Sequence, residues 1–116
     1  MPRKRTPSRA DAAVLILSAY PRRADAERAA RSLVRGRILA CATVAGSARA
    51  FYRWKGRLRS EGSFLLWGKT TSALANGAVR AIRVSHPDRV PEILVLRVSA
   101  GEPRYLRWLR GEVKRA

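Results

Sequence analysis

The sequence has one cysteine and one histidine among its 116 residues, and this scarcity excludes several kinds of site. A single cysteine, Cys41, cannot form an internal disulfide. Any catalytic serine would have to share the one histidine, and no Ser-His-Asp order results. No apolar run approaches the roughly 18 residues that a membrane span requires. We therefore expect neither a disulfide scaffold nor a membrane protein.

Other chemical signatures are missing as well. No closely spaced pair of carboxylates indicates acid–base catalysis. The segment Gly68-Lys69-Thr70 lacks the upstream glycines of a phosphate-binding loop. The first ten residues lack the apolar segment of a signal peptide. These absences predict a cytoplasmic protein that is not an enzyme and requires no cofactor.

Negative charge is also scarce, because 25 Lys and Arg residues face only 8 acids and give a net charge of +17. One interpretation is a polyanionic partner such as nucleic acid. The other is an arginine bias on an ordinary solvated surface, which the even spread of the basic residues and the lack of a nucleic-acid motif favour. Nonspecific, salt-sensitive binding to nucleic acid is expected in either case. The candidate anion-binding residues are Arg53, Lys55, Arg57 and Arg59.

The length of 116 residues predicts one domain, over residues 12–116, preceded by a disordered basic tail at 1–11. The run Val14–Leu17 is typical of a buried strand that Pro21 ends, and the apolar stripe of 23–35 indicates a helix closed by Gly36. The remaining elements are expected as a strand at 38–45, a break at Gly46-Ser47, a continuation at 50–58, a strand at 64–69 after Gly62, a helix at 73–84, a strand at 93–98 and a helix at 104–113.

This order, β-α-β-β-α-β with an extra C-terminal helix, predicts an α+β fold of the ferredoxin-like type. Such a fold has a four-stranded antiparallel sheet with helices on one face. The opposite face would leave apolar strand residues exposed, so we expect the chain to form an oligomer.

Several single residues are candidates for a site. His86, before Pro87, is either a lone metal ligand or a residue that caps the carbonyl end of a helix. Glu61 and Glu92 are isolated acids that could line a cleft. Aromatic residues with polar atoms either pack between subunits or form the wall of a ligand site. They are Tyr52, Trp54, Tyr105 and Trp108.

Two further residues are expected to be structural. Trp67 lies within an apolar strand and is predicted to belong to the core. Cys41 has the apolar neighbours Leu39, Ala40 and Ala42, which indicate a buried and unreactive thiol.

Motifs spread along the chain resemble those of the CutA family of divalent-cation tolerance proteins. They are Ala40-Cys41-Ala42, Tyr52-x-Trp54-x-Gly56, Lys69-Thr70, His86-Pro87, Pro91-Glu92 and Tyr105-Leu106-x-Trp108-Leu109. The resemblance covers about 13–113. It implies a compact homotrimer similar to PII-type signalling proteins, with a long hairpin reaching the next subunit, and a role in the response to copper and other divalent ions.

The metal ligands of the family are only partly present. Copper-binding members have a cysteine at the end of the first strand and a histidine beside the His-Pro motif, where this chain has Ser18 and Ser85. Only His86 matches. The missing thiolate disfavours Cu(I), so the resemblance implies weak or degenerate binding, with Cu(II) as the candidate ion. The alternatives are an arginine-rich trimer that binds an anionic small molecule or nucleic acid between its subunits, and a structural or scaffolding trimer.

Overall fold

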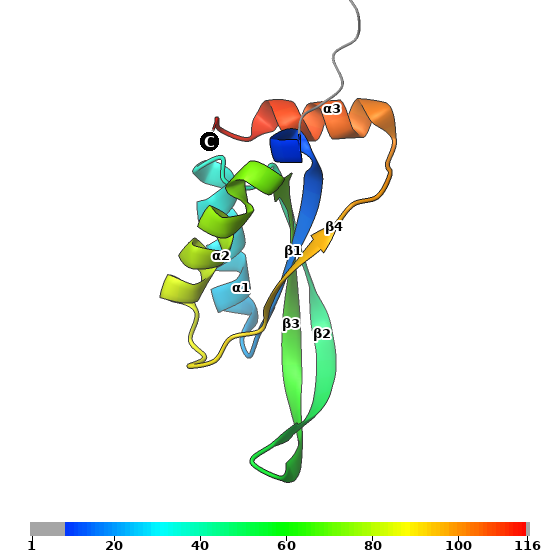
Figure 1. Ribbon diagram of the computed structural model, residues 1–116. Coiled ribbons are helices and arrows are strands. Elements are labelled where there is room, and N and C mark those ends of the chain that lie inside the picture. Colours follow the sequence, from blue (N-terminus) through cyan, green and yellow to red (C-terminus); the bar gives the residue numbers. More distant parts are fainter. Residues whose placement is uncertain (1–8, 116) are drawn as a thin grey trace, which may run out of the picture.

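The computed structural model describes residues 9–115, which form one antiparallel sheet and three α-helices (Figure 1). The strands are hydrogen-bonded in the order β2-β3-β1-β4, and every neighbouring pair is antiparallel. The elements in chain order are η1 (Arg9–Asp11), β1 (Ala13–Tyr20), α1 (Arg23–Arg35), β2 (Cys41–Trp54), β3 (Arg57–Thr71), α2 (Ser72–Ser85), β4 (Ile93–Arg97) and α3 (Pro103–Glu112). The predicted α+β, ferredoxin-like order is confirmed.

The predicted disordered tail is only partly testable, because residues 1–8 lie outside the described residues. Its last three residues, Arg9–Asp11, form a single 3-10 turn. The turn is followed by Ala12, whose carbonyl accepts a hydrogen bond from the Ser72 backbone N–H at 2.8 Å. The expectation of disorder is therefore wrong for 9–11, since the chain is already tied to α2 there.

Strand β1 organises the core, because it pairs with β3 on one side and β4 on the other. Its residues alternate between the two faces of the sheet. Ile16 and Tyr20 face the helices and pack with Leu33 of α1, Leu66 of β3 and Ile82 of α2. Figure 1 shows α1 and α2 together on this one side of the sheet.

The link from α1 to β2 differs from the prediction. Gly36 occupies the C-cap of α1, as expected, and Arg37 follows with a φ of 60°. The backbone N–H groups of Ile38 and Leu39 both donate to the Leu33 carbonyl, so these residues finish the helix end. Strand β2 consequently begins at Cys41 and not at Ile38.

The hairpin of β2 and β3 turns at Lys55 and Gly56, which have φ values of 52° and 77°. Left-handed conformations at both central residues are typical of a tight two-residue hairpin turn. The predicted strand ends are therefore wrong: β2 ends at Trp54 and not at Leu58, and β3 begins at Arg57 and not at Phe64, so that Gly62 lies within β3 and pairs with Arg49. The hairpin extends well beyond the helices in Figure 1 and helps to make the molecule 61 Å long.

A bulge in β2 changes which of its side chains share a face. Ala45 pairs with Leu65, and the next registered pair is Ala48 with Ser63, so β2 contains one extra residue. An extra residue reverses the alternation of the strand beyond it. The even-numbered residues of the outer half, including Tyr52, thus lie on the face that points away from the helices.

That face of the sheet has no cover within the described chain. The register places apolar side chains from three strands on it, and they are half-buried or exposed: Leu15, Leu17, Leu65, Trp67, Leu94 and Leu96. Leu94 is 52% exposed and Leu96 38%. The predicted bare apolar face is confirmed for the single chain. The prediction that Trp67 belongs to the core is wrong. Its side chain lies on this uncovered face, whereas its neighbour Leu66 lies on the helix-covered face.

Helix α3 crosses one end of the sheet (Figure 1). Pro103 begins it, and the Glu102 carboxylate accepts the Tyr105 backbone N–H at 3.0 Å as an N-cap. Leu109 is 2% exposed and packs on Ala13 and Ala40 in a second, smaller core. Within residues 9–115, no helix is both long and apolar enough to cross a membrane.

We expect two glycines of β3 to respond oppositely to alanine. A Cβ at Gly68 would lie 2.8 Å from Leu39 Cδ1, and Leu39 is only 1% exposed, so Gly68→Ala should cost about 1–3 kcal/mol through overpacking. A Cβ at Gly62 meets nothing within 4 Å, so Gly62→Ala should be neutral or stabilise by up to about 1 kcal/mol. Denaturant unfolding measures both changes, and equal effects would contradict the packing of Leu39 on Gly68.

Candidate functional site

A cavity of about 580 Å³ lies where the hairpin leaves the body of the protein. The end of β1, both strands of the hairpin and the loop after α2 supply its walls. It contains five residues singled out in the sequence: Tyr52, Trp54, Arg59, Glu61 and Glu92. Its other lining residues are Ala19, Tyr20, Pro21, Ala50, Phe51, Ser63, Asp88, Arg89 and Val90.

The strand register explains why the hairpin residues meet. Tyr52 is directly opposite Arg59, and Ala50 is directly opposite Glu61. Directly opposed residues of an antiparallel pair have side chains on the same face. Because the bulge at Ala45/Ala48 reverses the alternation, this shared face is the uncovered one. Through Tyr52, Arg59 and Glu61 the cavity therefore borders the bare apolar face of the sheet.

The charge of the cavity wall differs from that of the whole chain. Glu61, Asp88 and Glu92 supply three carboxylates against the two guanidinium groups of Arg59 and Arg89. The chain as a whole has 25 basic residues and 8 acids. Three of those eight acids thus line one cavity, so its wall is less basic than the chain as a whole.

Tyr52 reports on this local charge. Partial desolvation raises the pKa of the Tyr52 hydroxyl, and the nearby Glu61 carboxylate raises it further because a tyrosinate beside it would be a second negative charge. The Tyr52 hydroxyl therefore keeps its proton at neutral pH beside the Glu61 carboxylate.

His86 lies behind this wall and is 8% exposed. Its Nδ1 accepts the Asp88 backbone N–H at 3.0 Å, which leaves the proton on Nε2 to donate to the Ala19 carbonyl at 2.8 Å. The ring also stacks on Tyr20, with centroids 4.3 Å apart. The interpretation of His86 as a cap for helix carbonyls is wrong, since its ring joins β1 to the loop after α2.

Ser18 makes a second connection between the same two segments. Its hydroxyl is fully buried and donates to the Glu92 carbonyl at 2.8 Å. Beside it, burial raises the pKa of Tyr20, so that hydroxyl also stays neutral. Ser18 and His86 together hold the loop that carries Asp88 and Glu92 against the end of β1.

The structure places the other candidate aromatics elsewhere. Tyr105 and Trp108 pack on each other on α3, with ring centroids 5.5 Å apart, and both remain more than 40% exposed.

Cys41 is half-buried, contrary to the prediction of a buried thiol, and its sulfur lies 3.9 Å from Lys69 Nζ. Burial and the nearby Cys41 raise the pKa of Tyr105.

The candidate anion-binding residues divide between two places. Arg59 lines the cavity, whereas Arg53, Lys55 and Arg57 surround the tip of the hairpin and are exposed. Arg53 donates to the Gly56 carbonyl at 3.2 Å, which closes the turn. The four residues therefore do not form one binding site within a single chain.

Sequence reasoning missed Asp88 and Arg89 as lining residues. Their only signal was position, because they lie between the His86-Pro87 and Pro91-Glu92 motifs. They enter the cavity because the hydrogen bond from the Asp88 N–H to His86 fixes the path of this loop.

The cavity does not provide a closed metal site within one chain. Among residues 9–115, no three or more His, Cys, Asp or Glu side chains lie together as ligands for an ion. The three carboxylates are hard oxygen ligands that suit divalent cations, but they line the wall without converging. Both nitrogens of His86 are already hydrogen-bonded.

Comparison with known protein families gives a match to the family described as CutA1 divalent ion tolerance protein, over residues 14–112. The divalent-cation tolerance protein CutA of Pectobacterium atrosepticum is 35% identical over 102 residues, which are 88% of this chain and 93% of the relative. The protein of the same name from Escherichia coli is 32% identical over 103 residues, 89% of this chain and 92% of the relative.

Solved structures resemble the chain to a similar extent. CutA from Xylella fastidiosa has a TM-score of 0.84 at 35% identity, covering 88% of this chain and 98% of that one. The divalent cation tolerance protein of Thermus thermophilus has a TM-score of 0.85 at 30% identity, covering 88% and 99%. These similarities extend over most of the described chain.

We expect the pKa of Tyr52 to lie above the usual 10.0 and to fall in Glu61→Gln, because the amide removes a neighbouring negative charge. The fall should be partial, since desolvation remains. NMR titration of the labelled tyrosine Cζ atoms measures it, with Tyr105 in the same sample as the internal control. A Tyr52 pKa that is identical in both proteins would contradict the pairing with Glu61.

Proposed function

The chain belongs to the CutA1 divalent ion tolerance family, and we propose that it acts in divalent-cation tolerance as a cytoplasmic homotrimer without enzymatic activity. In this proposal, three copies pack the uncovered faces of their sheets together, as in the PII-like arrangement. The observation that carries the proposal is the bare apolar face of β1, β3 and β4, which includes Leu17, Trp67 and Leu94.

Packing this face removes exposed apolar surface from water. Leu94 is 52% and Leu96 38% exposed in the single chain. A contiguous apolar surface of this kind marks an interaction site, and burying it stabilises an assembly by about 25 cal/mol for each Å² removed from water. The sheet is therefore a better candidate for subunit contact than the arginine-rich outer faces of the helices.

The cavity adjoins the same face, so a neighbouring copy lies beside it in the assembly. Tyr52, Trp54, Glu61 and Glu92 then line a cleft between subunits, which supports a ligand site that one chain leaves incomplete. Tyr105 and Trp108 are the corresponding interface candidates on α3, where they remain exposed in the single chain. Tyrosine and tryptophan are enriched at such contacts.

Metal binding by the assembly is weak in this proposal. A Cu(II) ion at His86 must displace either the Asp88 N–H or the Ala19 carbonyl from the imidazole, and each bond contributes about 1 kcal/mol. Carboxylates from the cleft would complete the ligand set. The ion is then a reversible ligand, and the fold does not require it.

One alternative has support of its own. Arg53, Lys55 and Arg57 are exposed at the hairpin tip, where guanidinium groups suit phosphate. An anionic small molecule or nucleic acid bound there and at Arg59 would make the protein a sensor of an anion. The acidic wall of the cavity favours the cation-linked function.

Substitution of the sheet face tests the assembly. We expect Leu94→Glu to shift the mass in solution from about 39 kDa, three times the chain mass of 12.9 kDa, toward that of one chain. Val84→Glu is the matched control, because Val84 is 82% exposed on α2, away from the sheet face. Light scattering after size-exclusion chromatography measures both, and an unchanged assembly in Leu94→Glu would place the contact elsewhere.

Calorimetric titration tests the metal proposal. We expect weak, saturable Cu(II) binding to the native protein, loss of that signal in His86→Gln, and retention in Cys41→Ser, which removes the one thiol. The far-UV CD spectrum and the mass of each variant serve as checks on folding. Binding that survives in His86→Gln would show that His86 is not a ligand.

A further inference from the structure

A row of arginines follows the outer face of α1, on the side of the molecule opposite the bare sheet face. Arg28, Arg31 and Arg35 are exposed and are spaced by three and four residues, so they lie along one face of the helix. With a rise of 1.5 Å per residue, the row is about 10 Å long. We infer that this row binds the phosphate backbone of a nucleic acid.

The row is largely unneutralised. Arg28 is paired with Asp25 at 3.1 Å, but it is 75% exposed and gains little from that bridge. Arg31 and Arg35 have no ion pair and no hydrogen bond among residues 9–115. Their two charges therefore remain available to an external anion.

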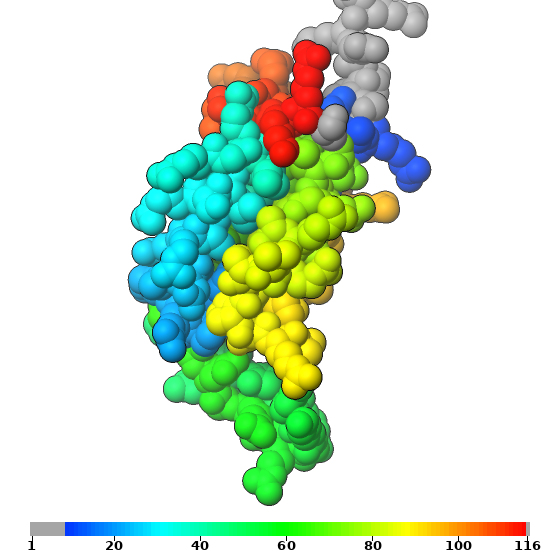
Figure 2. Space-filling view, turned by 90° about the vertical axis from the view of Figure 1, so that its left-hand side faces the viewer, coloured from blue at the N-terminus to red at the C-terminus, as the bar shows by residue number. Residues whose placement is uncertain are grey.

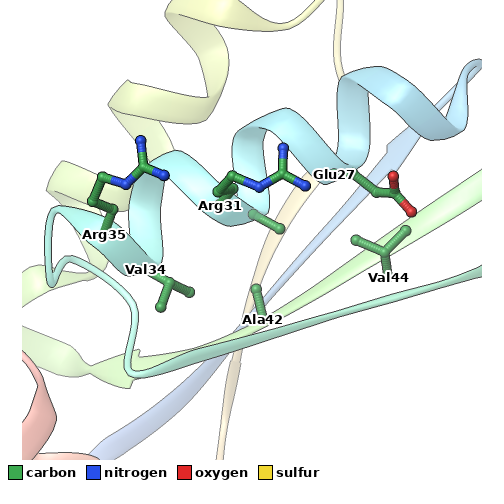
Figure 3. A pocket seen from close by; sticks show the side chains of 7 residues that line it. Glu27, Arg31, Val34, Arg35, Ala42 and Val44 are labelled. Carbon is green, nitrogen blue, oxygen red and sulfur yellow. The ribbon is translucent and has the colours of Figure 1, made fainter.

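The directions of the side chains at the groove between α1 and β2 explain why no acid of the described chain neutralises Arg31 and Arg35 (Figure 3). Figure 3 shows Arg31 and Arg35 extending side by side from the helix, away from Ala42, whereas Glu27 and Val34 point toward β2. Glu27 is four residues before Arg31, a favourable spacing for an ion pair, yet no bridge forms between them in the described chain. Like charges four residues apart repel, and a phosphate between them would relieve this repulsion.

Positive charge continues beyond the end of the helix. The Lys114 backbone N–H donates to the Arg37 carbonyl at 2.8 Å, which brings the chain after α3 beside the end of α1. Figure 2 shows these two segments in contact, α1 in cyan and the C-terminal chain in red. The Arg37 guanidinium binds the carbonyls of Gly111 and Glu112. Arg37 and Lys114 thus add two basic residues beside the end of the row, which fits an extended polymer better than a single small anion.

The charge of the surface selects among possible partners. A second copy carries +17 and is repelled from this face. A nucleic acid presents regularly repeated phosphates, each of which an arginine can bind through two hydrogen bonds. No aromatic side chain belongs to the row, so the contact is to the backbone and does not depend on sequence. Because α1 covers the outer side of the sheet, the row stays accessible when the bare faces pack together.

A charge-matched pair of variants tests the inference. Replacing Arg28, Arg31 and Arg35 by Gln lowers the net charge from +17 to +14, and replacing Arg53, Arg57 and Arg59 by Gln lowers it equally. Fluorescence anisotropy with a labelled DNA duplex of mixed sequence, at several salt concentrations, measures affinity. We expect at least a tenfold loss for the α1 variant and a much smaller loss for the hairpin variant. The slope of log affinity against log salt should flatten by about 2.7 for three lost phosphate contacts at about 0.9 each.

Three outcomes would overturn the inference. Equal losses in the two variants would mean that the overall charge, and not the row, binds DNA. No loss in the α1 variant would mean that the row makes no contact. Binding of polyglutamate that depends on the row, without row-dependent binding of DNA, would identify an acidic protein as the partner. Thermal unfolding of each variant confirms that the substitutions, all at exposed positions, leave the fold intact.

Discussion

The rest of the structure depends on a sheet that is apolar on both faces while its helices cover only one. β1 shows this directly: Ile16 and Tyr20 are buried under α1 and α2, whereas Leu15 and Leu17 point the other way with no cover from the described chain. Water opposes the exposure of that second face, and the net charge opposes association through the basic helices. The proposed assembly through the sheet satisfies both conditions.

The candidate site follows from the same sheet. One extra residue in β2, between Ala45 and Ala48, moves Tyr52 and Trp54 onto the uncovered face, where they meet Glu61 of β3. His86 and Ser18 then fix the loop that brings Asp88 and Glu92 to the same cavity. The result is a separation of charge: carboxylates gather beside the proposed subunit contact, and arginines of α1 lie on the outside.

Strong local signals allowed most of the fold to be predicted from the sequence. Pro21 ends β1 and Pro103 begins α3, each through the fixed φ of its ring, and Gly36 occupies the C-cap of α1 as the sequence indicates. The hairpin turn was misplaced because the pattern of the strands continues through Lys55, whose left-handed conformation leaves no signal in the residue type. The break predicted at Gly46-Ser47 coincides with the bulge, but the pattern does not show that β2 continues through it with one extra residue, so the side of the sheet on which Tyr52 lies could not be predicted. His86 was correctly placed at a helix end, but its partner, the Ala19 carbonyl, is 67 residues away in sequence.

The central claim is that the bare face of the sheet joins copies of the chain and completes the cleft at its edge. Sedimentation equilibrium of the unmodified protein, over a range of concentrations and at physiological salt, tests it most directly. We expect a single species of about 39 kDa, three times the 12.9 kDa chain, that persists on dilution. A stable species of one chain mass at micromolar concentration would contradict it, because the apolar face would then remain in water.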